Sequence, residues 1–191
     1  METWQYPAFS AVVHLALFER VQNAKALRAR LISASTMPGA EGDAEREAVN
    51  FAFIDASLVA SDLHLQTALL YALLADSRGP LRTKTIHSEI LWALNPTNNI
   101  SEAIRRFGVS DSSQRLIVLR VSTGGDSAAA SAGPVEASML AATEGTIVPL
   151  SRIPEFCDWA QLKKYYKLPA EASPQRLLDI ITSTVATKAV A

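Results

Sequence analysis

The sequence predicts a single domain of the mixed α+β class, in which helices and strands interleave along the chain. Its 191 residues suit one ordinary domain, which buries about two-thirds of its unfolded surface without disulfides or metals. Short runs of branched aliphatic residues, typical of strands, alternate with longer segments whose apolar residues recur at helical spacing. No glycine-rich turn follows a predicted strand, so the sequence does not indicate a dinucleotide-binding or P-loop fold.

The first third of the chain predicts a strand, a helix, a loop and a second strand. Residues 11–18 are apolar and partly β-branched, which favours a strand buried on at least one face. Asn23 is a suitable cap for the helix that follows. Residues about 35–50 are mostly small or charged and show no period, so we expect an exposed, flexible loop. Residues 51–54 predict a second strand, and Asp55 is placed to cap the next helix.

A long helix and a pair of short helices are predicted next. From residue 57 to about residue 75, leucines widen the apolar stripe enough to indicate a helix buried in the middle of the fold. Residues 81–108 then predict two short helices around a polar turn, because Pro96 disfavours helical backbone at the residue before it. The rest of the sequence is organised around this two-helix unit.

The second short helix has clear start and end signals. Asn99 can accept from the free amides of the first turn, Glu102 follows at the spacing of a capping box, and Gly108 follows the last turn. One apolar stripe, which we expect to be buried, contains Ile100, Ala103, Ile104 and Phe107. Arg105 and Arg106 point away from that stripe, so the pattern predicts a basic ridge above a buried seam.

The last part of the chain predicts a central strand and a mobile connection. Residues 115–121 are a continuous branched-aliphatic run, which is typical of central strands. Residues 122–134 consist almost wholly of Ser, Gly, Ala and Thr and cannot pack a core, so a flexible connection is expected. Further predicted elements are helical turns at 135–142, an edge strand at 146–150, and helices that begin at Asp158 and Ser173.

Composition excludes several classes of protein. Eighteen basic and nineteen acidic residues leave a net charge of −1, so any nucleic-acid binding must be local. The single cysteine, Cys157, excludes an internal disulfide and a cysteine-based zinc site, which fits a reducing intracellular compartment. No apolar run approaches the roughly 20 residues that span a bilayer, and no secretion signal is present, so we expect a soluble, intracellular protein without membrane contact.

No catalytic constellation is found in the sequence. The three histidines stand in different predicted elements without neighbouring ligands, so no metal site and no cofactor are predicted. Cys157 has no nucleophile signature and is expected to be a small buried hydrophobe. Glu89 is the one acidic residue with two interpretations: a partner for Thr85 or for backbone amides in the turn, which we favour, or a catalytic group.

The polar turn and its flanks combine the residue types that bind RNA. Cations gather there as Arg82, Lys84, Arg105 and Arg106, together with the polar residues Asn95, Thr97, Asn98 and Asn99. Phosphates need cations, and unpaired bases need amide donors and acceptors beside an apolar surface. The alternative from composition alone is that the asparagines cap helices while the arginines face solvent.

The same stretch resembles a known family. The shared residues are Thr83 and Thr85, Glu89 and Ile90, the turn Pro96-x-Asn98-Asn99-Ile100, and Ala103 with Phe107 and Gly108. On these residues the chain is similar to the small KEOPS/EKC subunit that binds the complex's atypical kinase, the PRPK-binding protein (TPRKB) family. Weaker similarity at residues 23–24, 51–55 and 164–168 extends the resemblance over nearly the whole chain.

This resemblance implies a fold, partners and a function. The implied fold is a central, mostly antiparallel sheet of short strands packed by helices. The implied function is that of a non-catalytic subunit in the nucleus and cytoplasm. It would bind the PRPK-type kinase, modulate its ATPase or kinase activity, contact the modification ATPase indirectly, and bind tRNA, including the 3′ CCA end, for threonylcarbamoyladenosine modification. The tRNA-binding residues predicted on the matched turn and its neighbours are Arg82, Lys84, Asn95, Asn98, Asn99, Ile100 and Arg105.

Two other functions are compatible with parts of the sequence. Two short helices around a turn superficially suggest a DNA-binding helix-turn-helix, although the second helix carries only two basic residues. An enzyme with an unrecognised pocket is the other alternative, for which the sequence offers no nucleophile, base or cofactor loop. A telomere role suggested for fungal members of the family is a further alternative for the same complex.

Overall fold

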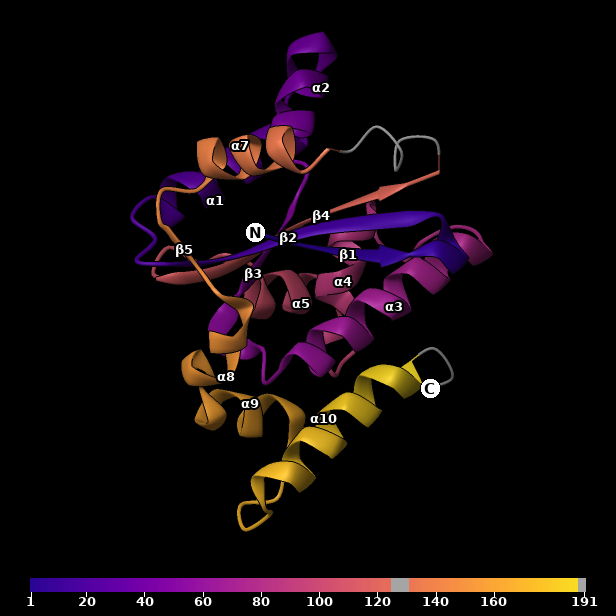
Figure 1. The fold of residues 1–191 in the computed structure, drawn as a ribbon, viewed down its shortest axis with the longest axis vertical. Coiled ribbons are helices and arrows are strands. Elements are labelled where there is room, and N and C mark those ends of the chain that lie inside the picture. The colour runs from indigo at the N-terminus through magenta and orange to yellow at the C-terminus, as the bar shows by residue number, and fades with distance from the viewer. Residues whose placement is uncertain (125–130, 189–191) are drawn as a thin grey trace. The chain divides into compact units, whose positions relative to one another are not determined.

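The computed structural model describes residues 1–124 and 131–188 and confirms the predicted mixed α+β class (Figure 1). The chain divides into two compact units, each made of two segments. The first unit contains Met1–Phe53 and Val109–Pro149. The second contains Ile54–Gly108 and Leu150–Ala191, and therefore includes the polar turn.

Five strands in the described ranges form one sheet in the order β1-β2-β4-β3, with β5 also beside β2 (Figure 1). The central pair is β2 (Ala11–Glu19) and β4 (Arg115–Thr123), which run antiparallel over their full length. The other edge of β2 is shared antiparallel by β1 (Glu2–Tyr6) and β5 (Thr146–Val148), and β3 (Ala52–Asp55) lies beside β4. The predicted strands are confirmed, but β1 was not predicted because it has no apolar run.

The core of the first unit lies between one face of the sheet and the helices α1 (Ala24–Thr36) and α7 (Ala132–Ala142). Helix α2 (Gly39–Ala48) packs against α1 and contributes no side chain to this core. Side chains alternate across a strand, so Phe18 of β2 and its register partner Leu116 of β4 point into the same core. Met139 of α7 packs there as well.

The predicted loop at 35–50 is wrong, because Gly39–Ala48 forms α2. Its alanine, glutamate and arginine residues are good helix formers, but a helix this polar shows no apolar period in the sequence. Arg30 of α1 forms an ion pair with Glu45 of α2, with 2.5 Å between Nε and Oε1. Arg46 of α2 donates a hydrogen bond to the carbonyl oxygen of Ala34 in α1. Contacts between two helices, such as this ion pair and this hydrogen bond, cannot be read from local spacing.

Two further expectations in the first unit are modified. The predicted flexible connection at 122–134 is partly regular, since β4 continues through Thr123 and α7 begins at Ala132, while residues 125–130 lie outside the described part of the chain. Asn23 makes no cap bond to α1. Its side chain donates to the Ala142 carbonyl and accepts from the Glu144 amide, each at 3.0 Å.

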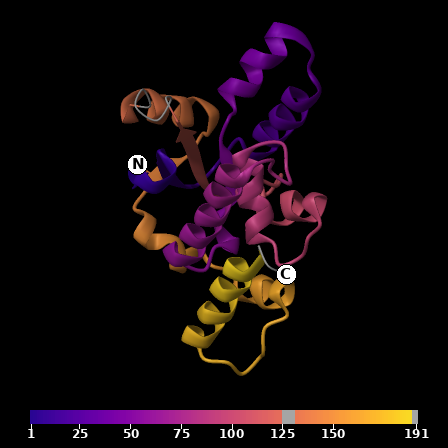
Figure 2. The ribbon, with the colours of Figure 1, turned by 90° about the vertical axis from the view of Figure 1, so that its right-hand side faces the viewer.

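The second unit is built from helices. Its longer members are α3 (Asp62–Arg78), α4 (Ile86–Leu94), α5 (Ile100–Phe107), α9 (Trp159–Tyr166) and α10 (Pro174–Thr187), and α8 (Ile153–Phe156) is a single turn. Helix α3 packs against both α4 and α10, and α4 packs against α5 (Figure 2). The 3-10 turns are Pro7–Phe9 in the first unit, with Ala56–Leu58 and Leu150–Arg152 in the second.

The long central helix starts later than predicted. Asp55 caps the turn Ala56–Leu58 by accepting from the Ser57 amide, and the Ser61 hydroxyl then caps α3. The central leucines Leu65, Leu69 and Leu73 are fully buried, as expected. Leu63 and Leu70, which were expected to widen the buried stripe, are exposed.

Candidate nucleic-acid interface

The candidate interface is the turn of residues 95–99 between α4 and α5, together with the exposed surfaces beside it. Helix α4 begins with a capping box between Thr85 and Ser88. The buried carboxylate of Glu89 accepts from the Thr83 amide at 2.9 Å and from the Thr83 hydroxyl at 2.7 Å. Thr83 is therefore the partner of Glu89, and these two bonds fix the segment that carries Arg82 and Lys84 onto the first turn of α4.

The inner side of the turn is held by hydrogen bonds to its carbonyl oxygens. The indole Nε1 of Trp92 donates to the Asn98 carbonyl at 3.3 Å. The ammonium of Lys188 donates to the carbonyls of Trp92, Asn95 and Thr97. Buried backbone carbonyls need donors, and here side chains supply them where the helix has ended. The backbone path of the turn is therefore set from inside.

Asn95 belongs to this inner side. Its side chain is completely buried, and its Nδ2 donates to the Thr97 hydroxyl at 2.8 Å and to the Asn99 carbonyl at 3.4 Å. Its Oδ1 accepts from Arg106 at 3.4 Å. The turn folds around this amide, so Asn95, which was predicted to contact RNA, is enclosed within the turn instead of exposed.

Arg106 is also engaged within the fold. It pairs with Glu102 at 2.6 Å, and its guanidinium lies 4.3 Å from the ring centroid of Tyr165 on α9. Hydrogen bonds from Thr97 and then Asn95, with the charge of Arg106, lower the pKa of Glu102. The carboxylate therefore stays ionised and joins the turn to α5.

A buried hydrogen-bond chain fixes the end of α4. The Ala60 amide donates to His64 Nδ1 at 3.3 Å, so His64 Nε2 carries the proton and donates to Tyr166 at 3.0 Å. The Tyr166 hydroxyl donates to the Leu94 carbonyl. Burial lowers the pKa of His64 to about 3 and raises the pKa of Tyr166, so both groups are neutral at physiological pH. The chain ties α3, α9 and α4 together immediately before the turn.

The outer side of the turn is exposed. Six of the seven predicted RNA-binding residues are exposed: Arg82, Lys84, Asn98, Asn99, Ile100 and Arg105. The Arg82 guanidinium also lies 4.8 Å from the centroid of the Trp92 ring. The Oδ1 of Asn99 accepts from the Glu102 amide at 2.9 Å, which confirms it as the N-cap of α5. The exposed side therefore offers cations, amides and an isoleucine together.

The predicted buried stripe of α5 is wrong for two of its residues. Ala103 and Phe107 are buried, whereas Ile100 is 38% and Ile104 is 48% exposed. The reason is that α5 packs along a narrow line, where the Phe107 ring meets the rings of Tyr165 and Tyr166 on α9. The two isoleucines form an exposed apolar ridge beside the turn.

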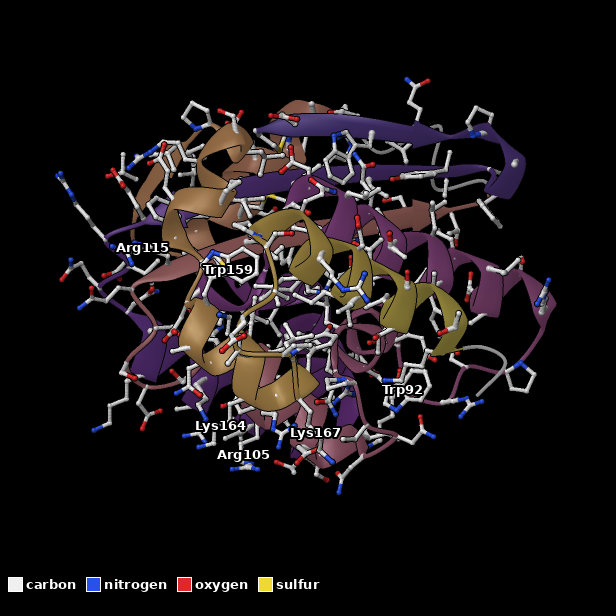
Figure 3. All side chains as sticks on the ribbon, turned by 90° about the horizontal axis from the view of Figure 1, so that it is seen from below. Trp92, Arg105, Arg115, Trp159, Lys164 and Lys167 are labelled. Atoms are coloured by element: carbon white, nitrogen blue, oxygen red, sulfur yellow. The ribbon has the colours of Figure 1, made fainter. Side chains whose placement is uncertain are left out.

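Sequence reasoning missed a second basic element beside Arg105. Figure 3 shows Lys164 and Lys167 of α9 along the same margin of the view as Arg105, and the ring contacts above place α5 beside α9. All three side chains are exposed, and within the described residues none of them forms an ion pair. The lysine-rich end of α9 was visible in the sequence, but its proximity to α5 depends on tertiary packing.

The other chemical groups considered do not assemble around the turn. Among residues 1–124 and 131–188, no group of three or more His, Cys, Asp or Glu side chains could hold a metal ion. Cys157 is half-buried instead of buried as expected, and burial, followed by the charge of Asp158, raises its pKa to about 12. In the described parts of the chain, no helix has the length and apolar character needed to cross a membrane.

Comparison with known proteins assigns the family. A sequence profile described as kinase binding protein CGI-121 matches residues 18–189. The chain belongs to the CGI-121 family. A relative named EKC/KEOPS complex subunit CGI121 from Cryptococcus neoformans is 35% identical over 230 aligned residues, covering 100% of this chain and 98% of the relative. The subunit of the same name from Aspergillus terreus is 38% identical, covering 91% of this chain and 83% of the relative.

A more distant relative also aligns over most of its length. The EKC/KEOPS complex subunit CGI121 of Candida glabrata is 30% identical, with 95% of this chain and 91% of the relative covered. The CGI-121 family assignment therefore includes both compact units, and it confirms the resemblance found on the turn and its flanks.

Proposed function

We propose that this CGI-121 protein is a non-catalytic subunit of an EKC/KEOPS complex that binds tRNA through the outer side of the 95–99 turn. The names of its relatives and the description of its family support complex membership and kinase binding. The contrast between a rigidly held inner side and an exposed polar outer side supports nucleic-acid binding. This contrast is the observation on which the RNA proposal depends.

The outer side has the chemistry that a single-stranded 3′ end requires. The amide of Asn98 is exposed, so it can offer a donor and an acceptor to a base edge. Ile100 and Ile104 provide an apolar surface beside it. Arg82 and Lys84, which precede α4, and the Arg105, Lys164 and Lys167 cluster supply charge for the phosphates.

A duplex-DNA reader is less well supported by the same geometry. The second helix of a helix-turn-helix enters the major groove and needs several free side chains to read base edges. Helix α5 is only eight residues long, and Arg106 is already paired with Glu102. Arg105 is then the remaining basic side chain of this helix, which favours single-stranded RNA over duplex DNA.

The first part of the proposal is that this subunit binds a kinase, as the description of its family indicates. The subunit would bind the small PRPK-type kinase, modulate its ATPase or kinase activity, and through it meet the modification ATPase that forms threonylcarbamoyladenosine on tRNA. A pull-down of the tagged chain from nuclear and cytoplasmic extracts should recover both proteins together. Recovery of neither would contradict complex membership.

The proposed tRNA binding is tested by measuring the affinity of the purified chain for tRNA at several salt concentrations. Affinity should fall with salt by a log-log slope of about 0.7 for each neutralised single-strand phosphate. Lys84→Glu should weaken binding, and the control Lys25→Glu, at an exposed lysine of α1, should not. Equal affinity of both variants and the wild-type protein would remove Lys84 from the interface.

A further inference from the structure

Lys188 is the described residue that follows α10, and it makes an unusual set of contacts. Its side chain is buried, with 5% of the residue exposed. The ammonium donates to the carbonyl oxygens of Trp92 and Asn95 and, at 3.0 Å, to that of Thr97. It also lies 3.7 Å from the centroid of the Trp92 ring, the distance of a cation–π contact.

These contacts place one positive charge at the C-terminal end of α4 and at the turn that follows it. The three carbonyls belong to residues that precede Lys188 by 91 to 96 positions in the sequence. The Trp92 carbonyl, in the last turn of α4, also accepts from the Asn95 amide at 3.2 Å, whereas the carbonyls of Asn95 and Thr97 lie just beyond the helix. The negative end of the helix dipole favours a cation at this place. An ammonium has three hydrogens that diverge from one nitrogen, and three carbonyls converge on it here. The fit between donor number and acceptor number is complete.

We propose that Lys188 is a positioning residue of the RNA-binding turn: its ammonium fixes the backbone from Trp92 to Thr97 so that Asn98 and Asn99 face solvent. This inference rests on the proposed RNA function for its consequence, although the positioning itself is independent of any ligand. It gives α10 a role at the interface without a contact to RNA.

The surroundings of Lys188 make lysine specifically suitable. Arginine carries its donors in a planar fork, which cannot direct three hydrogens from a single atom. The charged groups that act on Lys188 are Arg82 and Glu89, and Tyr71 of α3 packs on the Trp92 ring. Burial, and then Arg82, lower the pKa of Lys188 to about 7, while Glu89 raises it. Loss of the proton would leave two hydrogens for three carbonyls.

The test compares Lys188→Met with Arg176→Met, an exposed cation at the other end of α10. Amide hydrogen exchange reports on residues 92–100 without any ligand, and affinity for tRNA is measured in parallel. We expect Lys188→Met to speed exchange in this segment about tenfold, to leave β2 and β4 protected, and to weaken tRNA binding about tenfold. Arg176→Met should change neither quantity.

Further variants keep the inference falsifiable. If Lys188→Met does not fold, Lys188→Gln, which retains two donors, replaces it and should show a smaller increase in exchange. Lys188→Arg should not restore wild-type exchange. Unchanged protection of residues 92–100 in a folded Met or Gln variant would overturn the inference. If the wild-type protein does not bind tRNA, that result would overturn the proposed function. The hydrogen-exchange data would still decide whether Lys188 positions the turn.

Discussion

The inner and outer sides of the 95–99 turn use the same residue types for opposite purposes. Asn95 is completely buried with its amide hydrogen-bonded inside the turn, whereas Asn98, three residues later, is exposed. Arg106 is paired and stacked on Tyr165, whereas its neighbour Arg105 is exposed. The comparison teaches that a polar cluster can be divided into a buried scaffold and an exposed surface, which predicts that substitutions on the two sides will have different effects.

The largest expected effect is on the inner side, at Trp92. Replacing this fully buried ring with alanine removes the indole donor to Asn98 and the surface on which Lys188 and Arg82 lie. Trp92→Ala should lower the free energy of unfolding by about 3–5 kcal/mol in a denaturant titration. Trp159→Ala, at a partly exposed ring, is the control and should cost less. Equal losses would mean that the inner side is not a special scaffold.

The next effect is a pH dependence that comes from His64. Its pKa is about 3 in the folded protein and about 6.5 when unfolded, so the unfolded state binds more protons between these values. Stability should therefore be fully present above pH 6.5 and fall by about 1.4 kcal/mol for each pH unit as the pH drops toward 3. Urea titrations from pH 7.5 to 4.5 measure it. His64→Gln should remove this part of the slope, and an identical slope in the variant would refute the assignment.

Asn95 and Asn98 test the comparison directly. Asn95→Ala removes the buried amide that bonds Thr97 and Arg106, although both of these residues keep Glu102 as a partner. It should cost about 1–3 kcal/mol of stability, with weaker tRNA binding as a consequence. Asn98→Ala should leave stability within about 0.5 kcal/mol of wild type and still weaken tRNA binding. Thermal unfolding and filter binding of both variants give the two quantities. If Asn95→Ala and Asn98→Ala lowered the free energy of unfolding equally, the distinction between the inner and outer sides would be contradicted.

The smallest expected effect on stability, close to zero, is at the basic cluster of α5 and α9. Arg105→Gln, Lys164→Gln and Lys167→Gln remove charges that form no ion pair in the described structure. Each should change the free energy of unfolding by less than about 0.5 kcal/mol. Each residue that contacts a phosphate should reduce the slope of log affinity against log salt by about 0.7. An unchanged slope in the triple variant would exclude this surface from the interface.

Much of this architecture could be predicted from local signals. Pro96 located the turn, Asn99 located the start of α5, and the aliphatic run at 115–121 located β4, because each signal acts within a few residues. Glu102 does not complete the expected capping box, because its carboxylate bonds Thr97 and Arg106 instead. The side of the turn on which a residue lies could not be predicted. Asn95 and Asn98 look alike in the sequence, and only packing against Arg106, Trp92 and Lys188 separates them.

The errors have the same physical origin. Helix α2 is joined to α1 by an ion pair and a hydrogen bond, and the exposure of Ile100 and Ile104 depends on how narrowly α5 packs against its neighbours. The contacts of Lys188 join residues more than 90 positions apart. Tertiary partners override local propensity in each case, so the scaffold of the candidate site was harder to predict than its exposed residues.

The most direct test of the central claim is a double-mutant cycle between the outer side of the turn and the 3′ end of tRNA. Dissociation constants are measured for wild type and Asn98→Ala, each with intact tRNA and with tRNA that lacks CCA, at one salt concentration. If the turn binds the CCA end, each change alone should weaken binding about tenfold, and the two together should weaken it no further. Fully additive losses, or no loss on removal of CCA, would contradict the account.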